Sequence, residues 1–477
     1  MTAEATRYNP KRRRQQLPSN TIRYRAAYQV GAPPKTPRNT SLLRQSTLLR
    51  LGISPLLHEW YEQPMTSNVR RLDGWRFDAG MGQVGSECPP ARAPLGGTMY
   101  DRLACEVGAQ ARMNYKLSID NLSKRYGDFI ALEPTSLNVE EGQFVTLLGP
   151  SGSGKTTLLM MVAGLTEPDD GEIWIDGRRA THAPPYARDI GMVFQNYALF
   201  PHLSIHENIA FPLRMRKIAR AEIDREVKRV LDIVQLPHVA DRLPSALSGG
   251  QQQRIALARC IVFKPSLILM DEPLGALDKK LRDQLQLEIK HLHRKLGTTI
   301  LYVTHDQQEA LTMSDKICLM NHGRIEQFGT PDEIYFRPKT VFGADFLGES
   351  NIFDVSIEKS SGDYVTLKSK VFGEQRIMAP SVDWLHGREC SALIRPECIR
   401  IGAGTENANA VEGVIRETIF SGSVTTFYVE IPGGEVVFGE ALTSRSAPLP
   451  PPGASVTISW PIDTTVLLPP KPAGAAK

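Results

Sequence analysis

Eight consecutive residues have the composition of a loop that binds phosphate groups. They are Gly149, Pro150, Ser151, Gly152, Ser153, Gly154, Lys155 and Thr156. The glycines would let backbone N–H groups curl around phosphate oxygens without a clash from a Cβ atom. The Lys155 ammonium would reach the same oxygens, and the Thr156 hydroxyl would ligate Mg²⁺. An ordinary turn rich in glycine and serine is the alternative interpretation.

The residues on either side of this loop favour phosphate binding. An apolar run at 144–148 precedes the loop and is typical of a buried strand, and the apolar stretch at 157–163 behind it is typical of a helix. Strand, glycine-rich loop and helix in this order are the setting that a P-loop requires. The positive end of the helix dipole adds to the attraction for phosphate. The sequence therefore predicts a nucleotide site.

Two adjacent carboxylates stand at the end of a second apolar run. The run covers 267–270, and Asp271, Glu272 and Pro273 follow it. Two carboxylates at the end of a buried strand are costly unless they meet a cation. Asp271 would hold Mg²⁺, directly or through water, and Glu272 would face the γ-phosphate and orient or deprotonate an attacking water. By itself, such a pair is more often a helix start or a solvated turn.

A second possible anion cradle lies between these two motifs. Ser248, Gly249, Gly250 and Gln251 precede an apolar, helix-like run at 255–259. A serine and glycines at a helix start can bind an anion, although an ordinary N-cap is the alternative. One chain does not need two phosphate cradles for one nucleotide. The second cradle therefore suggests a nucleotide held by another copy of the chain, and hence a dimer.

In this order of motifs, residues 115 to about 345 resemble the nucleotide-binding subunit of an ATP-binding cassette (ABC) transporter. The resemblance implies ATP and Mg²⁺ as ligands. It identifies Gln195 as the Q-loop glutamine, which contacts Mg²⁺ or the attacking water, and His305 as the switch histidine, which contacts the γ-phosphate. It also implies that Tyr126 stacks on adenine and that Asp278, in the D-loop, crosses to the partner copy.

The resemblance sorts the expected site residues into three groups, and because every motif is present we expect a competent ATPase. The expected catalytic residues are Glu272, His305 and Gln195. The expected Mg²⁺ ligands are Thr156, Gln195 and Asp271. The residues expected to bind the nucleotide are Tyr126, Gly149, Pro150, Ser151, Gly152, Ser153, Gly154, Lys155, Thr156, Thr157, Ser248, Gly249, Gly250, Gln251 and Asp278.

The segment 196–204, which follows the Q-loop, mixes apolar and polar residues without a clear period. The resemblance makes it part of a groove that receives a coupling helix of the permease. A loop that faces the core of the helical subdomain is an equal alternative. Apolar residues mark a contact surface only if they are exposed, and the sequence does not show which of these residues are.

The chain changes character after residue 348. Short segments there alternate apolar and polar residues, as half-buried strands do, with a hairpin-turn signal at Pro432-Gly433-Gly434. These segments are 353–357, 364–367, 411–417, 424–431, 435–438 and 455–460. We expect an α/β P-loop NTPase domain with a helical subdomain at 113–348, followed by a small all-β barrel of the TOBE or OB type at 349–477.

Two further segments indicate an importer. Residues 346–351 (FLGESN) and 393–397 (LIRPE) resemble the junction and an internal segment of the accessory barrel in importer ATPases, above all the spermidine/putrescine type. The resemblance implies a homodimer that couples ATP hydrolysis to solute uptake through two integral-membrane permease subunits and, indirectly, an extracytoplasmic solute-binding protein. Ferric iron, aminoethylphosphonate, sulfate and sugar importers are alternatives, because the solute does not contact this subunit.

The resemblance implies a location at the cytoplasmic face of the inner membrane, and the sequence indicates that any membrane role is peripheral. No run approaches the ~18 apolar residues that span a bilayer, and the six cysteines form no CxxC pair, which argues for reduced thiols. The net charge of +4 hides an arginine-rich segment, since residues 1–112 hold 17 Lys and Arg against 8 Asp and Glu. We expect this segment to be disordered, and a misassigned start before Met113 is favoured over a targeting or nucleic-acid-binding tail. No nucleic-acid partner is expected.

Two other classes of function fit part of the sequence. Soluble cassette ATPases of translation or DNA repair have no permease, but they usually carry two fused cassettes or a long coiled-coil insertion. This sequence has one cassette and no long heptad array. The other alternative makes the barrel a sensor of a small ligand, with ATPase activity secondary.

Overall fold

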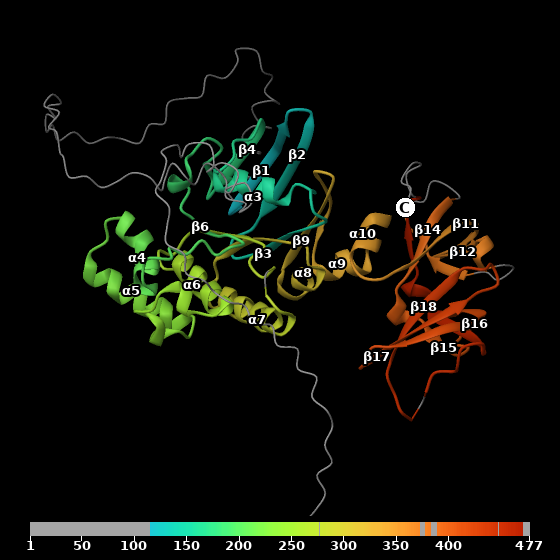
Figure 1. Ribbon diagram of the computed structural model, residues 1–477. Helices are drawn as coiled ribbons and strands as arrows, with labels where there is room; N and C mark the ends of the chain where they lie inside the picture. The colour runs from blue at the N-terminus through green and yellow to red at the C-terminus, as the bar shows by residue number, and fades with distance from the viewer. Residues whose placement is uncertain (1–114, 276, 373–376, 383–388, 447, 471–477) are drawn as a thin grey trace, which may run out of the picture. The chain divides into compact units, whose positions relative to one another are not determined.

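The structure of the protein is a computed structural model that describes residues 115–275, 277–372, 377–382, 389–446 and 448–470 (Figure 1). The predicted disordered segment, 1–112, lies outside these residues. In the described part of the chain, no helix is both long enough and apolar enough to cross a membrane.

A six-stranded sheet forms the centre of the α/β domain. Its strands are β3 (Phe144–Leu148), β6 (Ile190–Val193), β7 (Leu267–Asp271), β8 (Thr299–Thr304), β9 (Lys316–Asn321) and β10 (Arg324–Gly329). Their order is β10-β9-β3-β8-β7-β6, and all neighbours are parallel except β10, which pairs antiparallel with β9. The strands β3, β7 and β8 are apolar and buried, as parallel strands covered on both faces must be. The loops after their carboxyl ends meet at one edge of the sheet, where open α/β sheets bind ligands.

A smaller antiparallel sheet shares a core with the central sheet. Its strands, in the order β2-β1-β4-β5, are β1 (Leu117–Tyr126), β2 (Phe129–Val139), β4 (Asp170–Ile175) and β5 (Arg178–Arg179). One cluster of buried side chains joins this sheet, the central sheet and α3 (Lys155–Ala163), and it includes Leu117, Leu158 and Leu269. The helix behind the P-loop is therefore fixed by packing against both sheets.

Helices cover the other part of the central sheet. They are α4 (Ile205–Met215), α5 (Arg220–Ile233), α6 (Gly249–Ile261), α7 (Lys279–Leu296), α8 (Gln307–Met313), α9 (Pro331–Phe336) and α10 (Val341–Phe346). A second cluster of buried side chains connects α4 to α7 with the strands β6, β7 and β8. Side-chain oxygens of Ser204, Ser248, Asp278 and Asp306 cap α4, α6, α7 and α8, which explains where these helices begin. The predicted α/β domain with helices is confirmed.

Two five-stranded antiparallel sheets form the C-terminal region (orange to red in Figure 1). The first contains β11 (Asn351–Ser361), β12 (Tyr364–Lys368), β13 (Ile377–Pro380), β14 (Glu389–Ile394) and β20 (Val466–Leu468). The second contains β15 (Arg400–Ile401), β16 (Ala408–Phe420), β17 (Val424–Glu430), β18 (Val436–Leu442) and β19 (Ser455–Pro461). Both sheets contribute to one core around Phe372, Phe427 and Trp460. The expected all-β region after the α/β domain is confirmed.

Single-turn 3₁₀ segments link several of these elements. They are η2 (Pro185–Ala187), η3 (Pro237–Val239), η4 (Pro244–Ala246), η5 (Lys370–Phe372), η6 (Pro396–Cys398) and η7 (Ile462–Thr464).

Candidate nucleotide-hydrolysis site

The P-loop joins β3 to α3 and is crowded by its neighbours. Gly154 has a φ of +94°, and a Cβ at this position would lie 2.6 Å from the carbonyl oxygen of Ala131. A Cβ at Gly149 would lie 2.1 Å from the carbonyl oxygen of Met320. Any side chain at either position would force backbone atoms apart, so glycine is a steric requirement of this loop. The loop is therefore held in one shape by β2 and β9.

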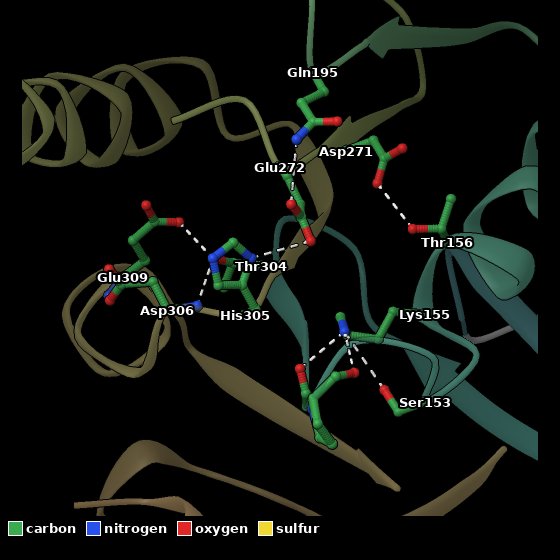
Figure 2. Close-up of polar contacts among 12 residues, drawn as sticks. Ser153, Lys155, Thr156, Gln195, Asp271, Glu272, Thr304, His305, Asp306 and Glu309 are labelled. Carbon is green, nitrogen blue, oxygen red and sulfur yellow. Dashed lines mark hydrogen bonds and ion pairs between the residues drawn. The ribbon is translucent and has the colours of Figure 1, made fainter. Parts of the chain in front are cut away.

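Lys155 points its ammonium into the loop that precedes it. The side chain is 4% exposed, and Nζ donates to the carbonyl oxygens of Gly149 (2.8 Å) and Pro150 (2.9 Å) and lies 3.5 Å from the Ser153 hydroxyl (Figure 2). Burial lowers the pKa of Lys155, and the carboxylates of Glu272 and Asp271, at the end of β7, oppose this. The positive charge therefore sits inside the loop, where a phosphate could replace the carbonyl groups as its partner.

Thr156 and Asp271, two of the predicted Mg²⁺ ligands, lie together. The Thr156 hydroxyl donates to Asp271 Oδ1 over 3.3 Å. Burial raises the pKa of Asp271, and the charge of Glu272 adds to this, whereas the Thr156 hydrogen bond and Lys155 oppose it. One carboxylate and one hydroxyl beside a phosphate loop fit Mg²⁺, which takes few protein ligands and completes its shell with phosphate oxygens and water.

Glu272 brings the three predicted catalytic residues together (Figure 2). Its Oε1 lies 3.2 Å from His305 Nδ1, and its Oε2 accepts a 3.5 Å hydrogen bond from Gln195 Nε2. The backbone of Glu272 has a φ of +42°, and its N–H donates to the Val303 carbonyl oxygen over 3.0 Å. The loops after β6, β7 and β8 therefore converge on one carboxylate. The imidazole of His305 is 56% exposed and open to a further partner.

The second predicted cradle caps its own helix. Ser248 Oγ accepts from the Gln251 N–H (3.4 Å), and Gln251 Oε1 accepts from the Ser248 N–H (3.0 Å), so the two residues form a capping box at the start of α6. Ser248 and Gly249 are exposed, and Gly250 is buried. Ser248 is therefore the N-cap of α6. Because Ser248 and Gly249 are exposed, they are also accessible to a second molecule.

The remaining predicted residues lie at exposed or half-buried positions. Tyr126 is 52% exposed at the end of β1, with Lys124 Nζ 5.5 Å from its ring centroid. Asp278 accepts from the Leu281 N–H over 3.0 Å and thereby caps α7. On the P-loop side, the exposed residues are Ser151, Gly152 and Thr156, and the half-buried ones are Pro150 and Thr157.

The segment after the Q-loop is anchored to the helical part of the domain. Tyr197 and Ala198 both have positive φ (+62° and +44°), and Arg259 of α6 donates to both carbonyl oxygens (2.9 and 2.7 Å). Tyr197 is buried in the helical core. The fully buried Asn208 of α4 holds the backbone of Phe200 from both sides, as acceptor of its N–H (2.8 Å) and donor to its carbonyl oxygen (3.0 Å). Tyr197 therefore faces the core, whereas Asn196, Ala198, Pro201 and His202 are exposed.

The sequence did not predict that Arg259 and Asn208 anchor the segment after the Q-loop. Arg259 binds backbone carbonyls about 60 residues before it in the sequence, which no local pattern indicates. Asn208 binds the backbone of Phe200, only 8 residues before it, but a single asparagine in α4 is a weak signal for such a contact. The sequence also did not predict a buried network behind His305, in which the hydroxyls of Tyr302 and Thr304 donate to Glu309, because these side-chain contacts depend on how α8 packs against β8.

Two family models match this chain. One describes ABC transporters and matches residues 132–275, and the other describes TOBE domains and matches residues 392–468. The spermidine/putrescine import ATP-binding protein PotA of Rubrobacter xylanophilus is 44% identical over 345 residues, which cover 72% of this chain and 90% of that protein. This chain belongs to the ABC transporter family. Proteins of the same name from Pseudomonas aeruginosa (45% identity; 67% of this chain, 88% of theirs) and Nitrosomonas eutropha (42%; 75% and 99%) are similarly alike.

The chain is thus an ATP-binding ABC transporter ATPase with a C-terminal TOBE region, as the order of its motifs predicts. The ABC match includes the P-loop and both carboxylates after β7, and the TOBE match begins within β14. The roles of individual site residues stay predictions.

Proposed function

We propose that this ABC ATPase is the energy-coupling subunit of a polyamine importer, with spermidine and putrescine as its solutes. The names of its relatives, which match over most of their length, support the solute class. The convergence of Gln195 and His305 on Glu272, beside the P-loop, carries the proposal of a hydrolytic site. In this proposal, residues 113–348 form the nucleotide-binding domain, and 349–477 form the TOBE-like barrel.

In the ATP-bound state, the P-loop holds the β- and γ-phosphates, and the Lys155 ammonium shifts from loop carbonyls to phosphate oxygens. Tyr126 stacks on the adenine. Thr156, Asp271 and Gln195 would hold Mg²⁺, which would neutralise charge on the phosphates. The 3.3 Å contact between the Thr156 hydroxyl and Asp271 supports this assignment, because it brings two oxygen ligands to one point.

Hydrolysis then depends on three side chains of this chain. The Glu272 carboxylate orients the attacking water and accepts its proton. His305 turns from Glu272 towards the γ-phosphate, and its exposure leaves room for this movement. Gln195 Nε2 holds the second carboxylate oxygen over 3.5 Å and so fixes the direction of the lone pairs that meet the water.

A second copy of the chain completes each site. The side chains of Ser248 and Asp278 cap their own helices, but both residues are exposed and could also meet a nucleotide or loop of another molecule. Each ATP would lie between Lys155 of one copy and Ser248 of the partner subunit. Closure of the dimer would drive two integral-membrane permease subunits, which receive solute from an extracytoplasmic binding protein. The protein would then act as a peripheral subunit at the cytoplasmic face of the membrane.

The test is a co-purification from membranes. A tagged Glu272→Gln variant should hold ATP and keep the complex closed, so membranes solubilised in ATP should yield two integral-membrane subunits with it. Uptake of radiolabelled spermidine by vesicles that contain this complex supports the polyamine assignment. Uptake of only iron, aminoethylphosphonate, sulfate or sugar would overturn the polyamine assignment. Co-purification of ribosomal or DNA-repair proteins without membrane subunits would overturn the assignment as a transporter subunit.

A further inference from the structure

Arg282, on the first turn of α7, contacts two loops of the hydrolysis site. Its Nη2 donates to the carbonyl oxygen of Leu277, in the D-loop, over 3.0 Å. Its Nη1 donates to Oδ2 of Asp306, the residue after the switch histidine, over 3.1 Å. Its Nε lies 3.9 Å from Oε1 of Glu309. One guanidinium group therefore joins the D-loop to the loop that carries His305.

The far side of this connection is rigid. Glu309 is 2% exposed, and its Oε2 accepts hydrogen bonds from the hydroxyls of Tyr302 and Thr304, both over 2.7 Å. The Asp306 side chain accepts from the Glu309 N–H (3.1 Å), and the Asp306 N–H donates to the Thr304 hydroxyl (3.0 Å). The residues on both sides of His305 are thus tied to the end of β8. The carboxylates of Asp306 and Glu309 are the fixed end of the connection.

The near side is the part of the chain that a second copy would meet. Leu277 precedes Asp278, the exposed N-cap of α7, and Arg282 also donates its backbone N–H to the Asp278 carbonyl oxygen (2.9 Å). A shift of the D-loop on contact with a partner would therefore pull on the guanidinium. The planar guanidinium reaches Leu277 and Asp306 with two separate nitrogens, whereas a lysine has a single nitrogen to place between them.

We propose that Arg282 is a positioning residue that transmits docking of a second copy at the D-loop to His305. The inference rests on the proposed homodimer. Arg282 contacts neither nucleotide-binding nor water-activating atoms in this arrangement, so its loss should impair hydrolysis without impairing ATP binding. The loss of activity should appear as a lower kcat and not as a higher KM, because the position of His305 matters only once ATP is bound.

The experiment compares purified Arg282→Met, Arg282→Lys and a matched control, Arg229→Met. Arg229 also forms a close ion pair (2.7 Å to Glu226), but it lies on α5 away from the site. We expect Arg282→Met to lower kcat about 10- to 100-fold, as a small displacement of a catalytic group does, with KM for ATP within about twofold of wild type. Arg282→Lys should recover part of kcat, and Arg229→Met should match wild type.

A double-mutant cycle with Asp306→Asn separates transmission from a general loss of stability. Asparagine keeps an oxygen to cap α8 but loses the charge that faces Arg282. If the two residues act through their ion pair, Arg282→Met/Asp306→Asn loses no more kcat than the worse single variant. Additive losses would overturn the inference, as would an unchanged kcat or a rise in KM alone. If Arg282→Met does not fold, Arg282→Lys takes its place in the cycle.

Two outcomes distinguish this inference from the proposed function. A wild-type protein that hydrolyses no ATP overturns both. A wild-type protein that hydrolyses ATP cooperatively, together with an Arg282→Met variant of equal kcat and equal Hill coefficient, overturns only the role of Arg282.

Discussion

Glu272 is the residue on which the hydrolytic site depends. Its left-handed backbone is unfavourable for a residue with a side chain and costs about 1–3 kcal/mol. Here it directs the carboxylate towards His305 and Gln195. These two contacts favour the catalytic interpretation of the Asp271-Glu272 pair over a helix start or a surface turn.

Replacement of Lys155 tests the P-loop. Lys155→Ala removes the only ammonium that the loop carbonyls of Gly149 and Pro150 surround in the described residues. We expect ATP affinity to fall about 100-fold or more, since a charged hydrogen-bond donor contributes ~3 kcal/mol. Titration calorimetry measures the loss, and Lys264→Ala, at a lysine that is 72% exposed, is the control. Equal affinity of Lys155→Ala and wild type would refute phosphate binding by this residue.

Asp271 should reduce the stability of the nucleotide-free protein. Its pKa is raised, chiefly by burial, so its ionisation opposes folding. The penalty is absent below the ordinary carboxyl pKa and grows as pH rises through the raised value. At pH 7, Asp271→Asn should therefore melt about 2–4 °C above wild type, the shift that ~1 kcal/mol gives, while Mg²⁺-dependent hydrolysis is lost.

Calorimetric melting without nucleotide checks this expectation, with the exposed Asp232→Asn as the control. The difference in melting temperature should shrink as pH is lowered through the raised pKa of Asp271 and disappear below the ordinary aspartate pKa of about 4. A variant that melts below wild type at pH 7 would contradict the assigned cost of the charge.

At the scale of elements, the sequence predicts well where local pattern and burial agree. The strands β3, β7 and β8 are continuous apolar runs, and the motifs at their ends place the site. The C-terminal strands β15 and β20 were missed because two or three residues carry no period. Strand β14 (ECSALI) was missed because small and polar residues occupy buried positions between β11 and β20. Its burial comes from strand pairing, which a local pattern does not contain.

The start of α6 offers a test that separates capping from nucleotide binding. Ser248→Asp keeps a good N-cap, so its melting temperature should stay close to wild type, whereas Ser248→Ala should lose about 1 kcal/mol. If Ser248 meets the γ-phosphate of an ATP held by a partner, the aspartate repels it, and ATPase activity should fall further in Ser248→Asp than in Ser248→Ala. Steady-state ATPase assays distinguish the two roles. Wild-type activity in a stable Ser248→Asp variant would show that Ser248 acts only as an N-cap.

At the scale of the whole molecule, one chain holds half of each expected site. The P-loop, the Thr156–Asp271 pair and Glu272 lie together, whereas Ser248 and Asp278 cap helices at exposed positions. The sequence predicts this division, because motif order alone shows two phosphate cradles in one chain. The contacts of Arg282 and Glu309 could not be predicted, since they join residues of α7, α8 and β8 through side chains whose directions depend on packing.

The most direct test of a shared hydrolytic site is the molar mass of Glu272→Gln, by light scattering during size-exclusion chromatography, without and with ATP and Mg²⁺. Glutamine keeps the shape of the side chain but cannot accept the proton of the attacking water. We expect the Glu272→Gln variant to be a monomer without nucleotide and a stable dimer with two unhydrolysed ATP molecules when ATP and Mg²⁺ are present. A variant that hydrolyses ATP at the wild-type rate, or that binds ATP and stays a monomer, would contradict this expectation.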